Sequence, residues 1–492
     1  MKKLLSVILL FSILSTMSCK RDLTSVNTDS QNPLNVPSES LFTNAQKNLA
    51  DLLATPNVNT GIHRLIMQYW QETTYTDESN YDLTTRQIPS QIWNALYRSV
   101  IYNLEEAKRK IAGETFSSTE SVNTAIKANR INQAEVLEIY AFYYLVTTFG
   151  NIPYSDALQL VDGITLPKYD DQATVYSDLL TRLDAAISAF DDSNDGFGSA
   201  DIIYSSDIAS WIKFANSLKL KMAMTIADED NATAKTLAEE AVTAGVFTSS
   251  DDDAIFQYLS ASPNTNPIWT NLVQSGRKDF VACKTLVAEM QSLSDPRLPY
   301  YFTFDANGTY SGGDPGASSN YATFSKPSGP ILVAGSIGEV TNPDFPYHLL
   351  TYSEVEFYLA EAKQRGYSIT GTAQTHYNNA ITASILQWGG TEDEAATYLA
   401  QSGVAYDASD WRQSIGMQKW ISLYDQQMDS WIAWRIFDYP ELEAAVDAET
   451  DIPIRYTYPA TEQTVNTANY KANLTAMGGS DDVTVKLWFD TN

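Results

Sequence analysis

The sequence predicts a mainly α-helical fold, built of stacked helical hairpins with long irregular loops and little β structure. Two observations favour this fold class. Apolar side chains recur every three or four residues over most of the chain from Leu41 onward, and helix-ending residues interrupt these stripes. The clearest stripe is Ile131–Phe149, which is apolar on nearly every face after its first turn and stops at Gly150–Pro153. We therefore expect a fully buried helix there.

Other segments have the pattern of amphipathic helices that pack in pairs. Thr351 and Glu354 have the spacing of a capping box for a helix that ends at Gly366, and Ala373–Trp388 would complete a hairpin with it. The remaining helical stripes are Val175–Phe190, Trp211–Met222 and Met417–Trp431, the last interpreted as one helix that ends near Pro440. The hairpins are similar to degenerate tetratricopeptide units, although no strict repeat of about 34 residues survives. No linker divides residues 41–492, so we expect a single domain.

The amino terminus has the pattern of an export signal. Lys2 and Lys3 precede an apolar run, Leu4–Leu14, that is shorter than the roughly 20 residues needed to cross a membrane. Ser18 and Cys19 then suggest cleavage after residue 18 and lipidation (palmitate) of Cys19, which would anchor the mature chain. A lipobox prefers Leu where Thr16 stands, so an ordinary secretory signal is the alternative. Residues 19–40 are predicted to form a tether.

The composition and motifs exclude several functional classes. The formal net charge is −28, which we expect to repel nucleic acid and anionic lipid headgroups. The histidines His63, His348 and His376 have no partners at metal-ligand spacing, so we predict no metal and no cofactor. Asp191–Gly196 resembles the start of a calcium loop, but Ile202 replaces its bidentate glutamate, and we interpret the segment as a polar turn. The enzymatic alternative is an exported glycoside hydrolase with paired carboxylates, whose positions spacing alone cannot give.

Three irregular segments, residues 71–90, 260–276 and 303–347, are the candidate ligand loops. A sugar presents a flat apolar face to an aromatic ring and hydroxyls to Asn or Asp. The candidate ligand-binding residues are Tyr75, Asp77, Asn80 and Tyr81 in the first loop, Asn266 and Trp269 in the second, and Tyr310 and Tyr321 in the third. Trp269 is the preferred platform, because its loop offers no helical stripe in which to bury it. Alternatively, each aromatic residue anchors its own loop, and a peptide ligand would use the same surface.

A series of short motifs follows in order along the chain. They are Gln68–Gln71, Trp93–Tyr97, Thr148–Ala157, Pro167–Gln172, Trp211–Lys219, Asp295–Leu298, Tyr352–Phe357, Gln418–Trp420, Tyr458–Pro459 and Lys486–Asp490. Together they resemble the SusD/RagB family of outer-membrane nutrient-binding lipoproteins, and within it the SusD-like branch. The resemblance covers essentially the whole mature chain.

The resemblance implies a non-catalytic, lipid-anchored protein on the exterior of the outer membrane. Such a protein binds an oligosaccharide or another oligomeric nutrient and delivers it to a TonB-dependent transporter barrel of the SusC type. The motif residues are then mostly structural: Trp211 and Trp420 lie on core faces, and Arg297 holds a carboxylate or carbonyl. The alternatives are the glycoside hydrolase, a peptide-binding member of the same family, and a helical scaffold that binds only proteins.

Overall fold

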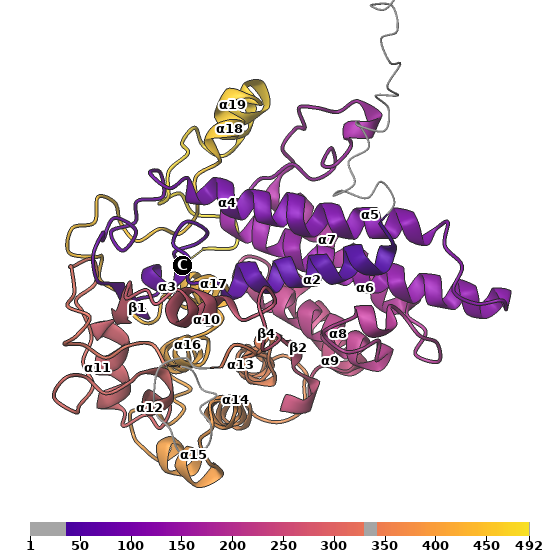
Figure 1. Ribbon diagram of the computed structural model, residues 1–492. Coiled ribbons are helices and arrows are strands. Elements are labelled where there is room, and N and C mark those ends of the chain that lie inside the picture. The colour runs from indigo at the N-terminus through magenta and orange to yellow at the C-terminus, as the bar shows by residue number, and fades with distance from the viewer. Residues whose placement is uncertain (1–35, 329–341, 492) are drawn as a thin grey trace, which may run out of the picture. The chain divides into compact units, whose positions relative to one another are not determined.

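The computed structural model describes residues 36–328 and 342–491 and confirms the mainly helical fold (Figure 1). Its longest helix, α6 (Glu120–Phe149), contains the predicted Ile131–Phe149 segment, and every residue from Val136 to Phe149 is buried. Gly150 ends α6 with a φ of 86°, which few residues other than glycine adopt. The expected signal peptide and Cys19 lie outside the described residues.

The helices of the stack are α2 (Ser38–Ala54), α4 (Ile88–Asn94), α5 (Tyr102–Ile111), α6, α7 (Gln172–Ala189), α8 (Ile208–Thr225), α9 (Asn231–Ala244), α13 (Tyr352–Gln364), α14 (Ala373–Gln387), α15 (Glu392–Leu399), α16 (Trp411–Ser422) and α17 (Gln427–Phe437). The shorter helices are α3 (His63–Ile66), α10 (Pro267–Trp269), α11 (Lys284–Ser292), α12 (Leu298–Tyr301), α18 (Ala460–Thr464) and α19 (Thr467–Ala476). Because α2 begins at Ser38, the last residues of the expected tether are helical.

Several helices that follow one another in the chain pack against each other as hairpins, as the sequence predicts. Helix α2 packs against α5, α5 against α6, α6 against α7 and α8 against α9 (Figure 1). The predicted pair α13 and α14 forms one of the most extensive helix contacts, and α13 also packs against α8. The hydroxyl of Thr351 caps α13 by accepting from the amide of Glu354 at 3.1 Å. The stack therefore joins helices that are more than a hundred residues apart in sequence.

The predicted single helix over Met417–Trp431 is wrong, because the chain breaks between α16 and α17. At the break the backbone carbonyls of Tyr424 and Asp425 accept hydrogen bonds from Arg64, at 3.2 and 3.3 Å. The Asp425 carboxylate also pairs with Arg64 at 2.8 Å. Arg64 thus satisfies carbonyl groups that a continuous helix would use internally.

Buried side chains of the motif residues hold the helices together. Trp211 and Trp420 are buried, as expected of core residues. Arg297 is also buried and confirms its expected role: its Nη2 lies 2.6 Å from Oδ2 of Asp295, and its Nη1 donates to Ser384 and Ser422 at 3.0 Å each. It therefore connects α12 with α14 and α16.

The strands are short and form two antiparallel pairs. Strand β1 (Trp70–Glu72) pairs with β3 (Phe280–Ala282), with Trp70 opposite Ala282. Strand β2 (Ala254–Phe256) pairs with β4 (Tyr347–Leu350). The β1–β3 pair matters most for function, because it adjoins two of the three candidate loops.

Candidate ligand-binding surface

The strand pair β1–β3 brings the three candidate loops to one surface. Strand β1 begins the first loop and β3 follows the second, so their pairing places the two loops side by side. The third loop joins them through a bridge between Cys283 and Gly313, where the amide of Lys284 donates to the Gly313 carbonyl at 2.9 Å. The loops are distant in sequence but adjacent in space.

Two residues of the first loop connect it to the third loop and to the chain that follows the second loop. The amide of Thr73 donates to the Asp279 carbonyl at 2.8 Å, and the Thr73 carbonyl accepts from the Ser319 amide at 3.0 Å. The side chain of Gln71 donates to the Ala317 carbonyl at 2.9 Å. These bonds fix the loops to one another, so side chains on them keep defined positions.

Asn80 has a structural role in this arrangement. Its Nδ2 donates to the carbonyls of Thr76 and Gly316, both at 2.9 Å, and its Oδ1 accepts from the Asp447 amide at 3.1 Å. Gly316 has a φ of 81°, and a Cβ there would lie 2.3 Å from Oδ1 of Asn80. Only glycine permits this close approach. The predicted ligand residue Asn80 therefore uses its amide within the protein.

The first hollow on this surface surrounds Tyr75 and has a volume of about 160 Å³. Its lining residues are Pro56, Asn57, Val58, Asn59, Glu72, Thr74, Tyr75, Arg86, Asn271, Leu272, Arg277, Asp279 and Phe280. Tyr75 is 79% exposed and has a φ of 57°. Burial raises the pKa of Glu72 to about 8, against hydrogen bonds from Ser79, so this carboxyl is mostly neutral at pH 7.

A second, smaller hollow lies beside Tyr321. Its lining residues are Leu272, Val273, Arg277, Phe280, Tyr321, Lys326 and Pro327. It shares Leu272, Arg277 and Phe280 with the Tyr75 hollow, so the two adjoin. We call them together the Tyr75–Tyr321 surface. It offers a flat aromatic side chain from the first loop and another from the third, with polar groups between them.

A third hollow, the acidic cleft, has a volume of about 500 Å³. It contains the predicted residues Asp77, Asn80 and Tyr81. The acidic side chains that line it are Asp77, Asp82, Asp447, Glu449, Asp481 and Asp482. Its aromatic residue, Tyr81, is only 5% exposed, so the cleft offers carboxylates but no open aromatic face.

Four other predicted ligand-binding residues are buried or half-buried and do not expose their side chains as a ligand site requires. Tyr81 is buried, and its hydroxyl accepts from the Ala445 amide at 3.1 Å, so a ligand cannot stack on its ring. Asn266 is also buried, because its side chain caps α10 by accepting from the Ile268 amide at 2.7 Å. Trp269 is half-buried against the core and lines neither hollow of the Tyr75–Tyr321 surface. Tyr310 is half-buried with its ring 4.9 Å from that of Phe304.

The expectation that residues 260–276 lack helical structure is wrong in part. Helix α10 begins at Pro267 and continues as a π-helical turn, Thr270–Gln274. The cause is an Asn–Pro pair, in which Asn266 supplies the cap and Pro267 takes the first helical position. This helical turn is what packs Trp269 against the core. In the sequence, the Asn266–Pro267 pair was the signal from which this helical start could have been predicted.

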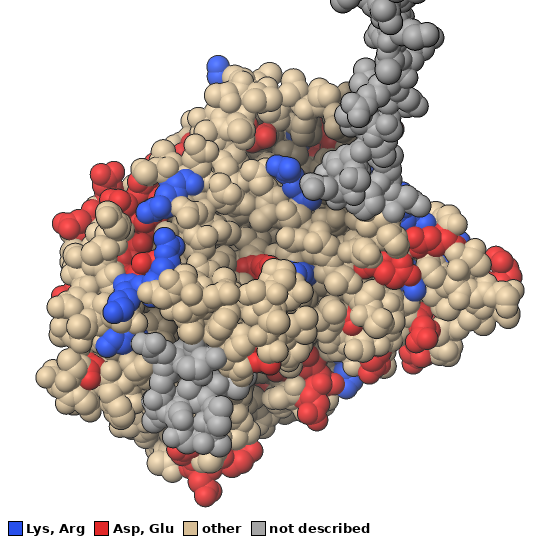
Figure 2. All heavy atoms as spheres, viewed as in Figure 1, with Lys and Arg blue, Asp and Glu red and all other residues tan. Residues whose placement is uncertain are grey.

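Sequence reasoning missed the basic side chains of the Tyr75–Tyr321 surface. Arg86, Arg277 and Lys326 line the two hollows, and Lys278 lies with its Nζ 5.6 Å from the centre of the Tyr321 ring. Figure 2 shows Lys and Arg side chains gathered on the side of the molecule where Figure 1 places β1. The signal was present in the sequence as basic residues within loops of an acidic chain.

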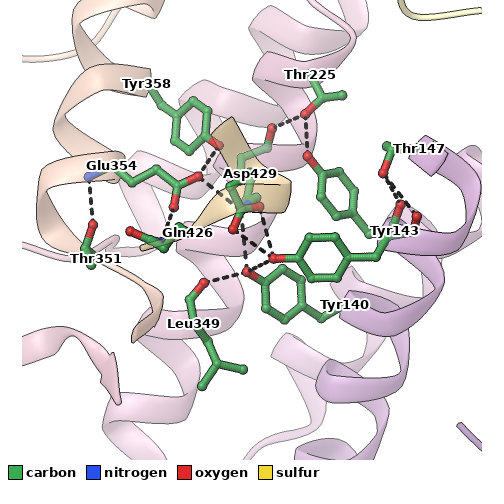
Figure 3. Close-up of polar contacts among 12 residues, drawn as sticks. Tyr140, Tyr143, Thr147, Thr225, Leu349, Thr351, Glu354, Tyr358, Gln426 and Asp429 are labelled. Atoms are coloured by element: carbon green, nitrogen blue, oxygen red, sulfur yellow. Dashed lines mark hydrogen bonds and ion pairs between the residues drawn. The ribbon is translucent and has the colours of Figure 1, made fainter. Parts of the chain in front are cut away.

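A pair of carboxylates deep in the helical stack, Glu354 and Asp429, is structural. Glu354 of α13 and Asp429 of α17 lie 3.0 and 2.5 Å from Nζ of Lys221, and all three are buried. Figure 3 shows tyrosines of α6 and α13 donating to the same carboxylates, for example Tyr144 to Asp429 at 2.9 Å. None of the hollows described above is lined by these residues. Because both carboxylates are buried, neither is offered to a ligand in these hollows.

Burial also governs the charges of this cluster. It raises the pKa of Asp429 to about 6, against the attraction of Lys221. Burial opposes the charge of Lys221, but Asp429 and Glu354 outweigh it and keep the pKa of the lysine well above its ordinary value. The cluster thus joins α8, α13 and α17 through the buried charge of Lys221, which is stable only because Asp429 and Glu354 neutralise it.

The described residues contain neither a metal-binding cluster nor a membrane-spanning helix. Within residues 36–328 and 342–491, His, Cys, Asp and Glu nowhere gather in threes in a way that would suit a metal ion. Over the same ranges, each helix is too short or too polar to span a bilayer.

Comparisons with known proteins identify a family from the sequence and related structures from the fold. A family model described as "Starch-binding associating with outer membrane", of the SusD-like type, matches residues 30–459. A search of curated proteins found no match. Solved structures with the same fold include a chitin-binding SusD homolog from Flavobacterium johnsoniae, with a TM-score of 0.76, 23% identity and coverage of 92% of this chain and 99% of that one. A SusD-like protein from Bacteroides thetaiotaomicron gives a TM-score of 0.76 at 23% identity, covering 93% of this chain and 99% of the other.

Proposed function

This chain belongs to the SusD-like family of non-catalytic binding proteins associated with the outer membrane, and on that premise we propose that it binds an oligosaccharide on the Tyr75–Tyr321 surface. The observation that carries the proposal is the exposure of Tyr75. A tyrosine ring that is 79% exposed beside a hollow is open to the flat face of a sugar. Asn59 and Asn271, which line the same hollow, are suited to sugar hydroxyls.

Backbone strain at Tyr75 supports the same proposal. A φ of 57° costs a side chain other than glycine roughly 1–2 kcal/mol. The Tyr75 side chain is almost fully exposed, so packing offsets little of this cost. Strain of this kind that is kept without a packing benefit is typical of functional positions.

The family premise extends to the membrane and to a partner. We propose that Cys19 carries the lipid anchor, that the protein faces the exterior, and that it passes its ligand to a TonB-dependent barrel of the SusC type. Supporting this are the export-signal pattern of residues 1–18 and the family's association with the outer membrane. Replacement of Cys19 by Ser should release the protein from the membrane fraction into the soluble fraction. If the variant stays in the membrane fraction, Cys19 does not carry the lipid anchor.

The binding proposal is tested by calorimetric titration of the mature protein with a panel of oligosaccharides and peptides. We expect at least one oligosaccharide to bind and to elute unchanged on chromatography. Tyr75→Ala should weaken that binding. The matched control is Tyr102→Ala, since Tyr102 is 48% exposed on α5 and lines neither hollow. Binding of peptides alone, cleavage of the sugar, or equal effects of both variants would contradict the proposal.

A further inference from the structure

We propose that the oligosaccharide bound on the Tyr75–Tyr321 surface is anionic, carrying carboxylate or sulfate groups. This inference rests on the function proposed above and specifies the class of its ligand. The observation behind it is a reversal of charge. The chain has 60 acidic and 32 basic residues, yet basic side chains gather around these two hollows.

Two lysine side chains lie beside the ring of Tyr321. The Nζ atoms of Lys278 and Lys326 lie 5.6 and 5.4 Å from the centre of its ring, within the range of a cation–π contact. Neither lysine has a carboxylate oxygen within 4.0 Å among the described residues. Both therefore keep their positive charge available beside an aromatic face. That combination suits a sugar ring that bears an anionic substituent.

Few negative charges oppose these two lysines, whereas Arg86 of the Tyr75 hollow is paired with Glu78. The Tyr321 hollow has Arg277 and Lys326 in its lining and no acidic residue. In the Tyr75 hollow the acidic residues are Glu72 and Asp279. Asp279 lies 3.4 Å from Arg277, and both side chains are about half exposed to solvent. Glu72 is buried, and its raised pKa leaves it mostly neutral at pH 7.

The local charge is the opposite of that in the neighbouring acidic cleft. The lining of that cleft begins at Thr76, the residue after Tyr75, and includes six acidic residues. An anionic ligand would be repelled there and attracted to the Tyr75–Tyr321 surface. The acidic cleft and the Tyr75–Tyr321 surface therefore favour ligands of opposite charge. This difference would direct an anionic ligand to the Tyr75–Tyr321 surface and away from the cleft.

The test is calorimetric titration of the mature protein with oligosaccharides of one length and different charge. The anionic probes are hexamers of galacturonate and of a sulfated galactan, and the neutral probes are maltohexaose and chitohexaose. We expect one anionic probe to bind at least about tenfold more tightly than either neutral probe. Its affinity should fall as the salt concentration rises, because salt screens exposed charges.

The lysines are tested by the double substitution Lys278→Gln and Lys326→Gln. We expect it to weaken anionic binding about tenfold and to leave the melting temperature unchanged, because Lys278 is exposed and Lys326 half-buried. The control is Lys168→Gln, since the Lys168 side chain is 60% exposed and lies outside both hollows. Carboxylate and sulfate probes distinguish the two kinds of anion.

Two results would overturn the inference separately from the function. If a neutral probe binds as tightly as the anionic ones and requires Tyr75, the proposed function stands and the anionic ligand is wrong. The same conclusion follows if the double lysine variant binds the anionic probe as tightly as the unaltered protein. Binding by none of the probes would contradict both proposals.

Discussion

Substitutions at Tyr75 should change ligand affinity and stability independently. Covering about 60 Å² of exposed ring with a sugar, at roughly 25 cal/mol per Å², contributes about 1.5 kcal/mol. Both Tyr75→Ala and Tyr75→Gly should therefore weaken binding roughly tenfold. Because Tyr75 is 79% exposed, neither variant loses much packing.

The stabilities of the two Tyr75 variants should differ from each other. Alanine keeps the cost of the left-handed backbone, roughly 1–2 kcal/mol, whereas glycine avoids it and loses about 0.5–1 kcal/mol in chain entropy. The Gly variant should therefore be as stable as the Ala variant, or up to about 1.5 kcal/mol more stable. Urea unfolding and titration calorimetry measure the two effects. Full affinity in both variants, or a Gly variant clearly less stable than the Ala variant, would refute this reasoning.

Three further predictions concern buried groups. Lys221→Met leaves Asp429 and Glu354 without their cation and should cost about 3–5 kcal/mol at pH 8 by urea unfolding. The folded pKa of Asp429 is raised, so the stability that protonated Asp429 contributes is lost as the pH rises through about 6. The stability cost of Lys221→Met should therefore be smaller at pH 5 than at pH 8. An equal cost at both pH values would contradict this reasoning. Glu72→Gln should gain stability relative to the unaltered protein above pH 8, because the raised folded pKa of Glu72 makes its ionisation destabilising there; parallel pH profiles would refute it. Cys283 is buried with its pKa raised to about 11, so a thiol reagent at pH 8 should react only after denaturation, and rapid labelling of the native protein would contradict its burial.

The regular part of the fold could be predicted from local patterns. Helix α6 and the α13–α14 hairpin follow from apolar spacing and from end signals such as Thr351 and Gly150. The break between α16 and α17 could not be predicted in this way, because it depends on Arg64, more than 350 residues earlier in the chain. Periodicity describes one helix at a time and contains no information about such a partner.

The candidate site was predictable at the level of loops and only partly at the level of residues. All three predicted loops meet at one surface, and Tyr75 and Tyr321 line adjoining hollows there. The burial of Tyr81 and Asn266 depends on contacts with Ala445 and on helix capping, which composition does not give. Loop composition identifies where aromatic and polar residues occur, but tertiary contacts decide which of them face solvent.

The most direct test of the binding surface is a crystal structure of the protein with the oligosaccharide that binds most tightly. We expect an intact sugar chain that lies across Tyr75 and Tyr321, with one ring stacked on Tyr75. A sugar bound in the acidic cleft beside Asp77, or elsewhere on the molecule with both tyrosines uncovered, would contradict the account.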